Sequence, residues 1–290
     1  MSKSIYILLF LFSVSLYSQK VKPKTIAVLS DSIRETSGLI AFDGLLWTHN
    51  DDHDTTLYGL DTLGKIKKQV RLTQVQNQDW EEISQDAENI YLGDFGNNYQ
   101  GNRTNLHILK IAKKTFYDAQ PKIDTISFRY ENQTDFSAVK PNSTDFDCEA
   151  FVVTNDSVYL FTKQWKSKQS NVYVLPNQVG DHIAKLKTTL PVKGLITGAT
   201  RTTDGENVIL CGYSKKGKPF LYWLPHFFEG HFSETNLKRI RLQLPFHQIE
   251  GIATFDGSRF YLTNEKLILK PIINVAPQLY EVDLSSFLKL

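Results

Sequence analysis

A five-fold internal repeat constrains this chain more than any other feature of its sequence. Each copy opens with a short apolar segment behind an acidic or small polar residue, and an aromatic or aliphatic strand follows. The five openings are Glu35–Leu39, Glu81–Ile83, Glu149–Phe151, Thr197–Ala199 and Glu250–Ile252. The strands that follow them are Leu46–Thr48, Ile90–Leu92, Val158–Leu160, Val208–Leu210 and Phe260–Leu262. Short strands recurring at a regular spacing are typical of a β-propeller, in which each repeat forms one blade.

The two ends of the chain indicate how the ring of blades closes. Further strands complete each repeat, but the fifth repeat ends at Leu290 without a fourth strand, whereas a spare strand, Lys24–Leu29, precedes the first repeat. We therefore predict an all-β, five-bladed β-propeller whose N-terminal strand completes the last blade and removes its open edge. A sixth blade within Asp118–Asp147 is the alternative, because that segment is longer than its counterparts. It holds one convincing strand.

The first eighteen residues have the features of a secretory signal peptide. Lys3 precedes the apolar run Ile5–Val14, and Leu16–Ser18 forms an acceptable cleavage site before Gln19. The apolar run is shorter than the roughly 20 residues that a membrane-spanning helix needs. We expect an exported protein with residues 19–290 as one propeller domain and no membrane span in the mature chain. A retained N-terminal anchor is the alternative.

Composition argues against a nucleic-acid partner and leaves two interpretations of the two cysteines. The formal net charge is +2, and the basic residues form no block longer than Lys113–Lys114 or Lys215–Lys216, so a nucleic-acid partner is not expected. Cys148 and Cys211 fall in neighbouring repeats and could form a disulfide in an oxidising compartment. Alternatively, both are small buried apolar residues.

Acidic residues recur at the face where functional loops of a propeller gather. The loops that lead into the first strand of each blade, and those between the second and third strands, share this face. They place carboxylates around the predicted channel mouth, with others one strand further out. The residues that we expect as metal ligands are Glu35, Asp51, Glu81, Asp94, Glu149, Glu250 and Glu265.

Carboxylates gathered at one mouth repel one another, so the group must gain protons or a cation. Hard oxygen ligands favour Ca²⁺ or Mg²⁺ over zinc or copper, so Ca²⁺ is the candidate cofactor, and no cofactor at all is the alternative. Salt bridges from Arg103, Lys163 or Arg201 are one alternative. Another is that each glutamate accepts backbone N–H bonds from its neighbouring blade and serves structure alone.

Two glutamates could perform acid–base chemistry, and polar and aromatic residues on the same loops could contact a ligand. If the site is hydrolytic, a bound cation would polarise a phosphoryl or carbonyl oxygen while Glu82 or Glu149 activates water. The residues expected to bind ligand are Asn50, Trp80, Asn97, Asn98, Arg103, Lys163, Trp165, Tyr213 and Asn264.

The run Asp51–Asp54 is rich in oxygen ligands, but it lacks the alternating ligands, glycine and terminal glutamate of an EF-hand loop. A solvated acidic loop is the simpler interpretation. The sequence has no His-Glu-x-x-His or Cys-x-x-Cys spacing and no Gly-x-Ser-x-Gly motif. Zinc and serine-hydrolase chemistry are therefore not expected.

The second repeat is the most distinctive. Asp79–Ile83, Tyr91–Asn98 and Arg103 together resemble a signature of secreted bacterial propellers related to the SdiA-regulated and esterase-like-phytase groups. Leu46–Asp51 and Asp147–Ala150 resemble the same pattern. The resemblance implies the fold; through the phytase-like relatives it implies calcium and ester or phosphoester hydrolysis only at a distance. Thr197 and Gly198 depart from the pattern where the other repeats carry an acidic residue.

These observations favour a cation-assisted site that binds or hydrolyses a small extracellular substrate in a monomeric, exported propeller. A second hypothesis is a non-catalytic module that binds a glycan or a protein through aromatic residues on the loop face, such as Trp80, Tyr99, Trp165 and Tyr213. A third is a structural envelope protein that serves as a scaffold.

Overall fold

The computed structural model describes residues 19–51, 53–229 and 237–288. The predicted signal peptide, residues 1–18, and Asp52 of the acidic run lie outside them. Strands dominate the described residues, joined by three single-turn 3-10 helices, η1 (Asp31–Ile33), η2 (Lys113–Thr115) and η3 (Phe227–Glu229). The all-β prediction is confirmed.

Most strands belong to antiparallel meanders, in which each strand pairs with the next along the chain. One sheet comprises β3 (Thr36–Phe42), β4 (Leu45–Asn50), β5 (Thr56–Leu60) and β6 (Ile66–Arg71). The next two meanders are β7 (Trp80–Gln85), β8 (Asn89–Asp94), β9 (His107–Ala112), β10 (Ile123–Tyr130), and β11 (Cys148–Val153), β12 (Ser157–Thr162), β13 (Ser170–Pro176), β14 (Gly180–Leu190). The described residues 118–147 contain one strand, β10.

The remaining sheets combine the end of the chain with its beginning. One contains β15 (Leu195–Arg201), β16 (Val208–Tyr213), β17 (Pro219–Leu224), β18 (Lys238–Leu242) and β1 (Gln19–Val21). Another contains β19 (Ile249–Thr254), β20 (Arg259–Asn264), β23 (Gln278–Asp283) and β2 (Lys24–Val28), and a small hairpin pairs β21 (Leu267–Leu269) with β22 (Ile273–Val275). The predicted pairing of the N-terminal strand with the last meander is therefore found.

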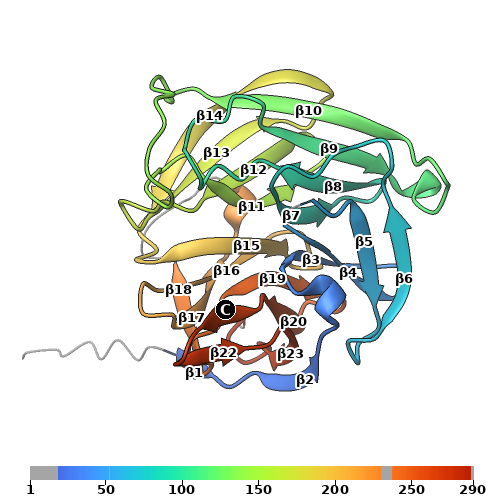
Figure 1. Ribbon diagram of the computed structural model, residues 1–290, viewed down its shortest axis with the longest axis vertical. Helices are drawn as coiled ribbons and strands as arrows, with labels where there is room; N and C mark the ends of the chain where they lie inside the picture. Colours follow the sequence, from blue (N-terminus) through green and yellow to red (C-terminus); the bar gives the residue numbers. More distant parts are fainter. Residues whose placement is uncertain (1–18, 52, 230–236, 289–290) are drawn as a thin grey trace, which may run out of the picture.

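The first strand of each meander lies innermost, as Figure 1 shows for β3, β7, β11, β15 and β19. Each inner strand contacts the next along the chain, and β19 contacts β3, so the ring of strands closes. A closed ring of antiparallel meanders is a propeller-like arrangement. It brings the first residues of all the inner strands together around the centre of the molecule.

Two pairings that cover outer strand edges were not predicted. β10 and β14, the outermost strands of neighbouring meanders, pair in parallel from Ile126 opposite Gly180 to Tyr130 opposite Ala184, which joins two meanders into an eight-stranded sheet. β1 adds in parallel to the edge of β18. An unpaired edge exposes N–H and C=O groups that can template association, so both pairings remove such edges.

Apolar side chains fill the spaces between neighbouring sheets. Trp47 and Phe116, from adjacent meanders, pack edge to face with ring centroids 4.9 Å apart. Phe95 and Phe151 repeat this contact between the next pair at 5.5 Å. All four rings are fully buried. Aromatic pairs of this geometry contribute about 0.5–1.5 kcal/mol each beyond the area that they bury.

Cys148 and Cys211 are both buried and free. Burial raises the pKa of each thiol. The interpretation of both as buried apolar residues is confirmed, and the alternative of a disulfide is wrong. Within the part of the chain that the structure describes, no helix is long and apolar enough to cross a bilayer.

Candidate functional site

Each inner strand has a β-bulge or similar irregularity in its register near its start. The register of β7 shifts between Trp80 and Glu82, that of β11 between Cys148 and Ala150, and β3, β15 and β19 have equivalent shifts. A bulge leaves the extra residue out of the ladder and redirects its side chain. The residues at these five corresponding positions are Ser37, Glu81, Glu149, Thr197 and Glu250.

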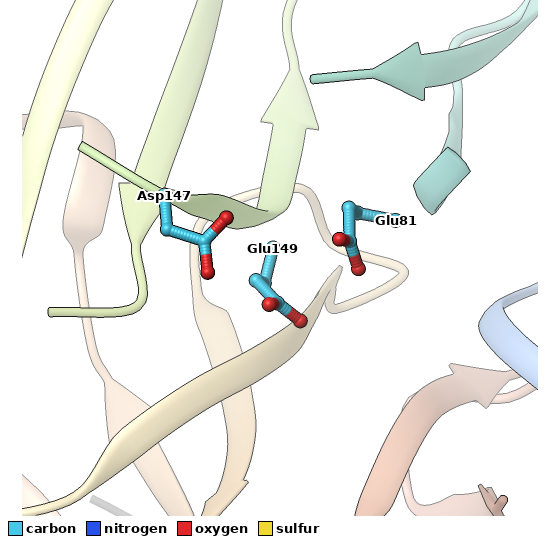
Figure 2. Close-up of side chains that lie close together, drawn as sticks. All are labelled: Glu81, Asp147 and Glu149. Carbon is cyan, nitrogen blue, oxygen red and sulfur yellow. The ribbon is translucent and has the colours of Figure 1, made fainter. Parts of the chain in front are cut away.

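Three carboxylates from two adjacent inner strands converge. One oxygen each from Glu81, Asp147 and Glu149 lies within 4.8 Å of the other two. Figure 2 shows the three side chains, with the carboxylate of Glu149 between the other two. All three residues are buried, with exposed fractions of 5%, 0% and 3%. We call Glu81, Asp147 and Glu149 the acidic cluster.

Burial makes the charged state of the acidic cluster costly. It is the largest contribution that raises the pKa of Glu81 well above its usual value, and the neighbouring Glu149 raises it further. Burial also raises the pKa of Glu149; the charge of Lys163 opposes this shift, and the charges of Asp147 and Glu250 add to it. Asp79, at the edge of the cluster, has its pKa raised to about 6 by burial and by Asp147. Such a group favours uptake of protons or of a cation.

Lys163 is the cationic side chain at the acidic cluster. Its Nζ lies 2.9 Å from Oε1 of Glu149, and both side chains are buried. Burial alone would lower the pKa of Lys163, but the charges of Glu149 and further acidic groups raise it well above the usual value. The aromatic faces of Trp165 and Tyr213 lie 4.9 and 5.7 Å from Nζ. Lys163 is therefore held as an ammonium ion within an acidic and aromatic environment.

Hydrogen bonds fix the orientation of Asp147. Its Oδ1 accepts the backbone N–H of Asn97 at 2.7 Å, and its Oδ2 accepts the indole N–H of Trp165 at 2.7 Å. Each carboxylate oxygen retains a second lone pair for another partner. Asn97 and Trp165, both expected to bind ligand, thus act here by holding an acidic residue in place.

Asp94 and Arg103 form a supporting ion pair beside the acidic cluster. Arg103 Nη2 donates to Asp94 Oδ1 at 2.7 Å, and Nη1 donates to the carbonyl of Gly96 at 2.8 Å. A Cβ atom at Gly96 would lie 2.3 Å from both Asp79 Cγ and Glu81 Oε1. Asp94 is therefore paired with an arginine outside the acidic cluster, and the missing side chain of Gly96 allows the carboxylates to approach.

Glu82, expected to activate water, has a different environment from Glu81. Its Oε1 accepts the backbone N–H of Ile83 at 2.9 Å, and its Oε2 accepts that of Ala199, on β15, at 2.7 Å. The side chain is fully buried. A Cβ atom at Gly38, on β3, would lie 2.5 Å from Oε1. Glu82 thus links three inner strands across the centre of the ring, and its expected role as a base that activates water stays a prediction.

A second group of polar residues lies on the other side of Lys163. Gln248 Nε2 donates to Glu265 Oε1 at 2.5 Å and to the Tyr213 hydroxyl at 3.3 Å. Burial, opposed mainly by Lys163, raises the pKa of Glu250 to about 8. Among the described residues, Oε2 of Glu250 has no hydrogen-bond partner. Glu250, Glu265 and Tyr213 thus lie near Lys163 without joining the acidic cluster.

Several predicted site residues lie elsewhere. Glu35 is partly exposed near Arg34, with Oε1 3.9 Å from Nε, and Ser37 takes the position that Glu35 was expected to fill. Asn50 Nδ2 donates to Ser32 O and Asp54 Oδ2. The carbonyl of Asp51 accepts the backbone N–H of Trp80, and Trp80 is fully buried against the ring of His49. The carbonyl of Asn98 accepts the backbone N–H of Asn142. Asn264 donates to the carbonyls of Glu265 and Ala276.

Asp147 was not among the predicted ligands, and Asp79 was not singled out. A sequence signal for both exists: Asp79 and Glu81 form an Asp-x-Glu triplet, and Asp147 and Glu149 form another at the same place in the next repeat. The residue between them points the other way along the strand, so the two acidic side chains share one face. The repeated triplet therefore marks the acidic cluster better than the glutamates alone.

Comparison of the sequence with protein-family models and with curated proteins finds no match. Two solved structures resemble the fold at a TM-score of 0.48. One is the PQQ-bound aldose sugar dehydrogenase of Streptomyces coelicolor, 9% identical, with 90% of this chain and 98% of that chain covered. The other is regucalcin, a calcium-binding protein of Agrobacterium tumefaciens, 12% identical, with 91% and 94% covered. At these TM-scores, no conclusion about function follows.

Proposed function

We propose that this protein binds a hard divalent cation, Ca²⁺, at the acidic cluster, and that the bound ion takes part in holding a small ligand. The observation that carries the proposal is the convergence of three buried carboxylate oxygens, all within 4.8 Å of one another. Calcium–oxygen distances are about 2.3–2.6 Å, so oxygens of one coordination sphere lie up to about 5 Å apart. The spacing of the acidic cluster fits a shared Ca²⁺ ion.

The surroundings of the acidic cluster support this proposal. Asp147 is oriented by Asn97 and Trp165, as outer-sphere hydrogen bonds commonly orient a ligand. The acidic cluster supplies three protein ligands, whereas Ca²⁺ takes six to eight oxygens. The remaining positions would accept water or oxygen atoms of a ligand, which gives the cation a role in recognition.

Hydrolysis is the more specific version of the proposal. A bound cation would polarise a phosphoryl or carbonyl oxygen, and Glu149 would activate water. The alternative, a non-catalytic glycan- or protein-binding module, is supported by Tyr99, whose side chain is 70% exposed on the long loop after β8. The two versions share the fold and differ in whether the cation is needed for ligand binding.

We also propose the finer architecture and setting. Five inner strands, each starting a meander, support a propeller of five blades forming one domain over residues 19–290. The resemblance of Asp79–Ile83 and Tyr91–Asn98 to secreted bacterial propellers and the features of residues 1–18 support export by a signal peptide. We propose that the protein is a monomer and that it acts on a small extracellular substrate or a glycan.

Thermal unfolding after EDTA treatment, with Ca²⁺, Mg²⁺ and Mn²⁺ then added separately, tests the cation site. An ion that binds only the folded chain at 100 times its Kd stabilises it by about 2.7 kcal/mol, which corresponds to a Tm rise of roughly 5–10 °C. Glu81→Gln removes a ligand and should abolish the rise. Glu265→Gln, a matched change at the same mouth but outside the acidic cluster, should retain it. A wild-type Tm indifferent to every ion, or an equal response in Glu81→Gln, would refute the proposal.

A further inference from the structure

Lys163 is placed where a bound cation would also need to be. Its Nζ lies 2.9 Å from Oε1 of Glu149, a member of the acidic cluster. Its backbone N–H donates to the carbonyl of Asp147, a second member, at 2.7 Å. The lysine is therefore fixed to the acidic cluster both by its main chain and by its side chain, and its exposed fraction is 5%.

The position of Lys163 in its sheet explains how it comes to be there. It follows β12 directly, opposite Asp147, which directly precedes β11. The corresponding residue in the sheet of β15 and β16 is Tyr213, opposite Leu195. The corresponding residue after β20 is Glu265. A lysine at this position thus sits between the acidic cluster on one side and Glu250, Glu265 and Tyr213 on the other.

The other nearby cation has different partners. Arg103 donates hydrogen bonds to the carboxylate of Asp94 and to the carbonyl of Gly96. The charge of Lys163 therefore offsets that of Glu149 in the cation-free chain. Charges buried in a low-dielectric site interact strongly, and the interaction scales with the product of the charges.

We propose that Lys163 is a built-in counter-cation that competes with the bound metal ion and sets the affinity and charge selectivity of the site. The inference rests on the proposed cation site. In the cation-free chain, the ammonium ion neutralises Glu149 and allows the acidic cluster to be buried. When a metal ion binds, the same ammonium ion repels it, so the chain retains a folded cation-free state at the expense of affinity.

Affinity measurements on Lys163→Met, Lys163→Arg and the wild type test the inference. Removing the charge should tighten Ca²⁺ binding at least tenfold, as measured by calorimetry, and Lys163→Arg should bind within about threefold of the wild type. Lys168→Met is the matched control: Lys168 Nζ also lies over the Trp165 ring, at 5.4 Å, but its side chain is only partly buried. Its affinity for Ca²⁺ should be unchanged.

Ion charge separates an electrostatic role from a merely structural one. Because repulsion scales with the charge of the bound ion, Lys163→Met should gain more affinity for Tb³⁺ than for Ca²⁺, about thirtyfold where the Ca²⁺ gain is tenfold. Terbium luminescence excited through Trp165, whose indole N–H contacts Asp147, reports binding directly. Equal gains for the two ions, or none, would overturn the inference.

Lys163→Met leaves buried carboxylates uncompensated and could prevent folding without an ion. The double variant Lys163→Met/Glu149→Gln removes both partners of the ion pair, so it should fold without Ca²⁺ and, because the repelling ammonium ion is gone, bind the ion more tightly than the Glu149→Gln single variant. If the wild type binds Ca²⁺ and Lys163→Met binds it no tighter, the competition is refuted while the cation site stands. If neither binds any ion, the proposed function fails, and the inference fails with it.

Discussion

Glu81 and Glu82 are adjacent in the sequence and both buried, yet their surroundings differ completely. Glu82 directs its oxygens at backbone N–H groups of Ile83 and Ala199, and so holds inner strands together across the ring. Glu81 directs an oxygen at two other carboxylates, Asp147 and Glu149. The bulge in β7 separates the two residues and sends their side chains in different directions.

The contrast between the surroundings of Glu81 and Glu82 indicates which buried carboxylates are candidates for a function. When the oxygens of a buried carboxylate accept backbone N–H bonds, the fold itself supplies its hydrogen-bond partners. A buried carboxylate that faces other carboxylates requires something from outside, a proton or a cation. Glu82 belongs to the first kind and Glu81 to the second, although a sequence motif treats the pair as one feature.

The largest effect that we expect comes from Glu82→Ala. This change leaves the N–H groups of Ile83 and Ala199 buried without an acceptor, at a cost of about 1–3 kcal/mol each. The Tm should fall by roughly 10 °C. Thermal unfolding measures the fall, and Glu81→Ala is the comparison.

Glu81→Ala should destabilise the cation-free chain far less, because it relieves repulsion within the acidic cluster. It should nevertheless abolish the Tm response to Ca²⁺, which Glu82→Ala retains if the variant is folded at the temperature used. Equal losses of Tm in the two variants would show that the surroundings of the two glutamates do not differ in energy as they do in geometry.

A smaller effect is expected from pH, through Glu250. Its pKa is about 8 in the folded chain, above its ordinary value of 4.5. A raised folded-state pKa means that the stabilising contribution is fully present below about pH 4.5 and is lost as the pH rises through 8. The cation-free wild type should therefore lose Tm between pH 5 and 9.

Glu250→Gln replaces the neutral acid by a neutral amide and should lose less Tm over this range. At pH 9 it should melt several degrees above the wild type. Melting curves at several pH values in EDTA measure the difference. If both proteins show the same dependence on pH, Glu250 is not the group responsible.

Much of the fold could be predicted because strand patterns are local. The predicted N-terminal strand Lys24–Leu29 differs from β2 by one residue. The parallel pairing of β10 with β14 could not be predicted, since it depends on where two meanders bring their outer edges. Sequence periodicity specifies which residues form a strand, whereas tertiary packing decides which edges meet.

The site could be predicted in part. The mouth with Glu81, Glu149, Glu250 and Lys163 followed from placing the repeats in register. The role of Glu82 could not be predicted, because a single bulge in β7 decides which of the two adjacent glutamates faces the acidic neighbours. Asp147 was passed over because it lies just before its strand, although its Asp-x-Glu spacing matches that of Asp79 and Glu81.

The smallest change in stability should come from Gly96→Ala, which affects Glu81 and not Glu82. The added Cβ would lie 2.3 Å from Glu81 Oε1 and from Asp79 Cγ, so it must displace these side chains and leave Glu82 untouched. Overpacking of this kind costs about 1–3 kcal/mol, or a Tm loss of roughly 2–12 °C. Calorimetry should show Ca²⁺ affinity reduced at least tenfold. Gly257→Ala, at another turn remote from the acidic cluster, is the control and should keep the wild-type affinity. Unchanged Ca²⁺ affinity in Gly96→Ala would mean that the approach of Glu81 to its neighbours is not what the cation requires.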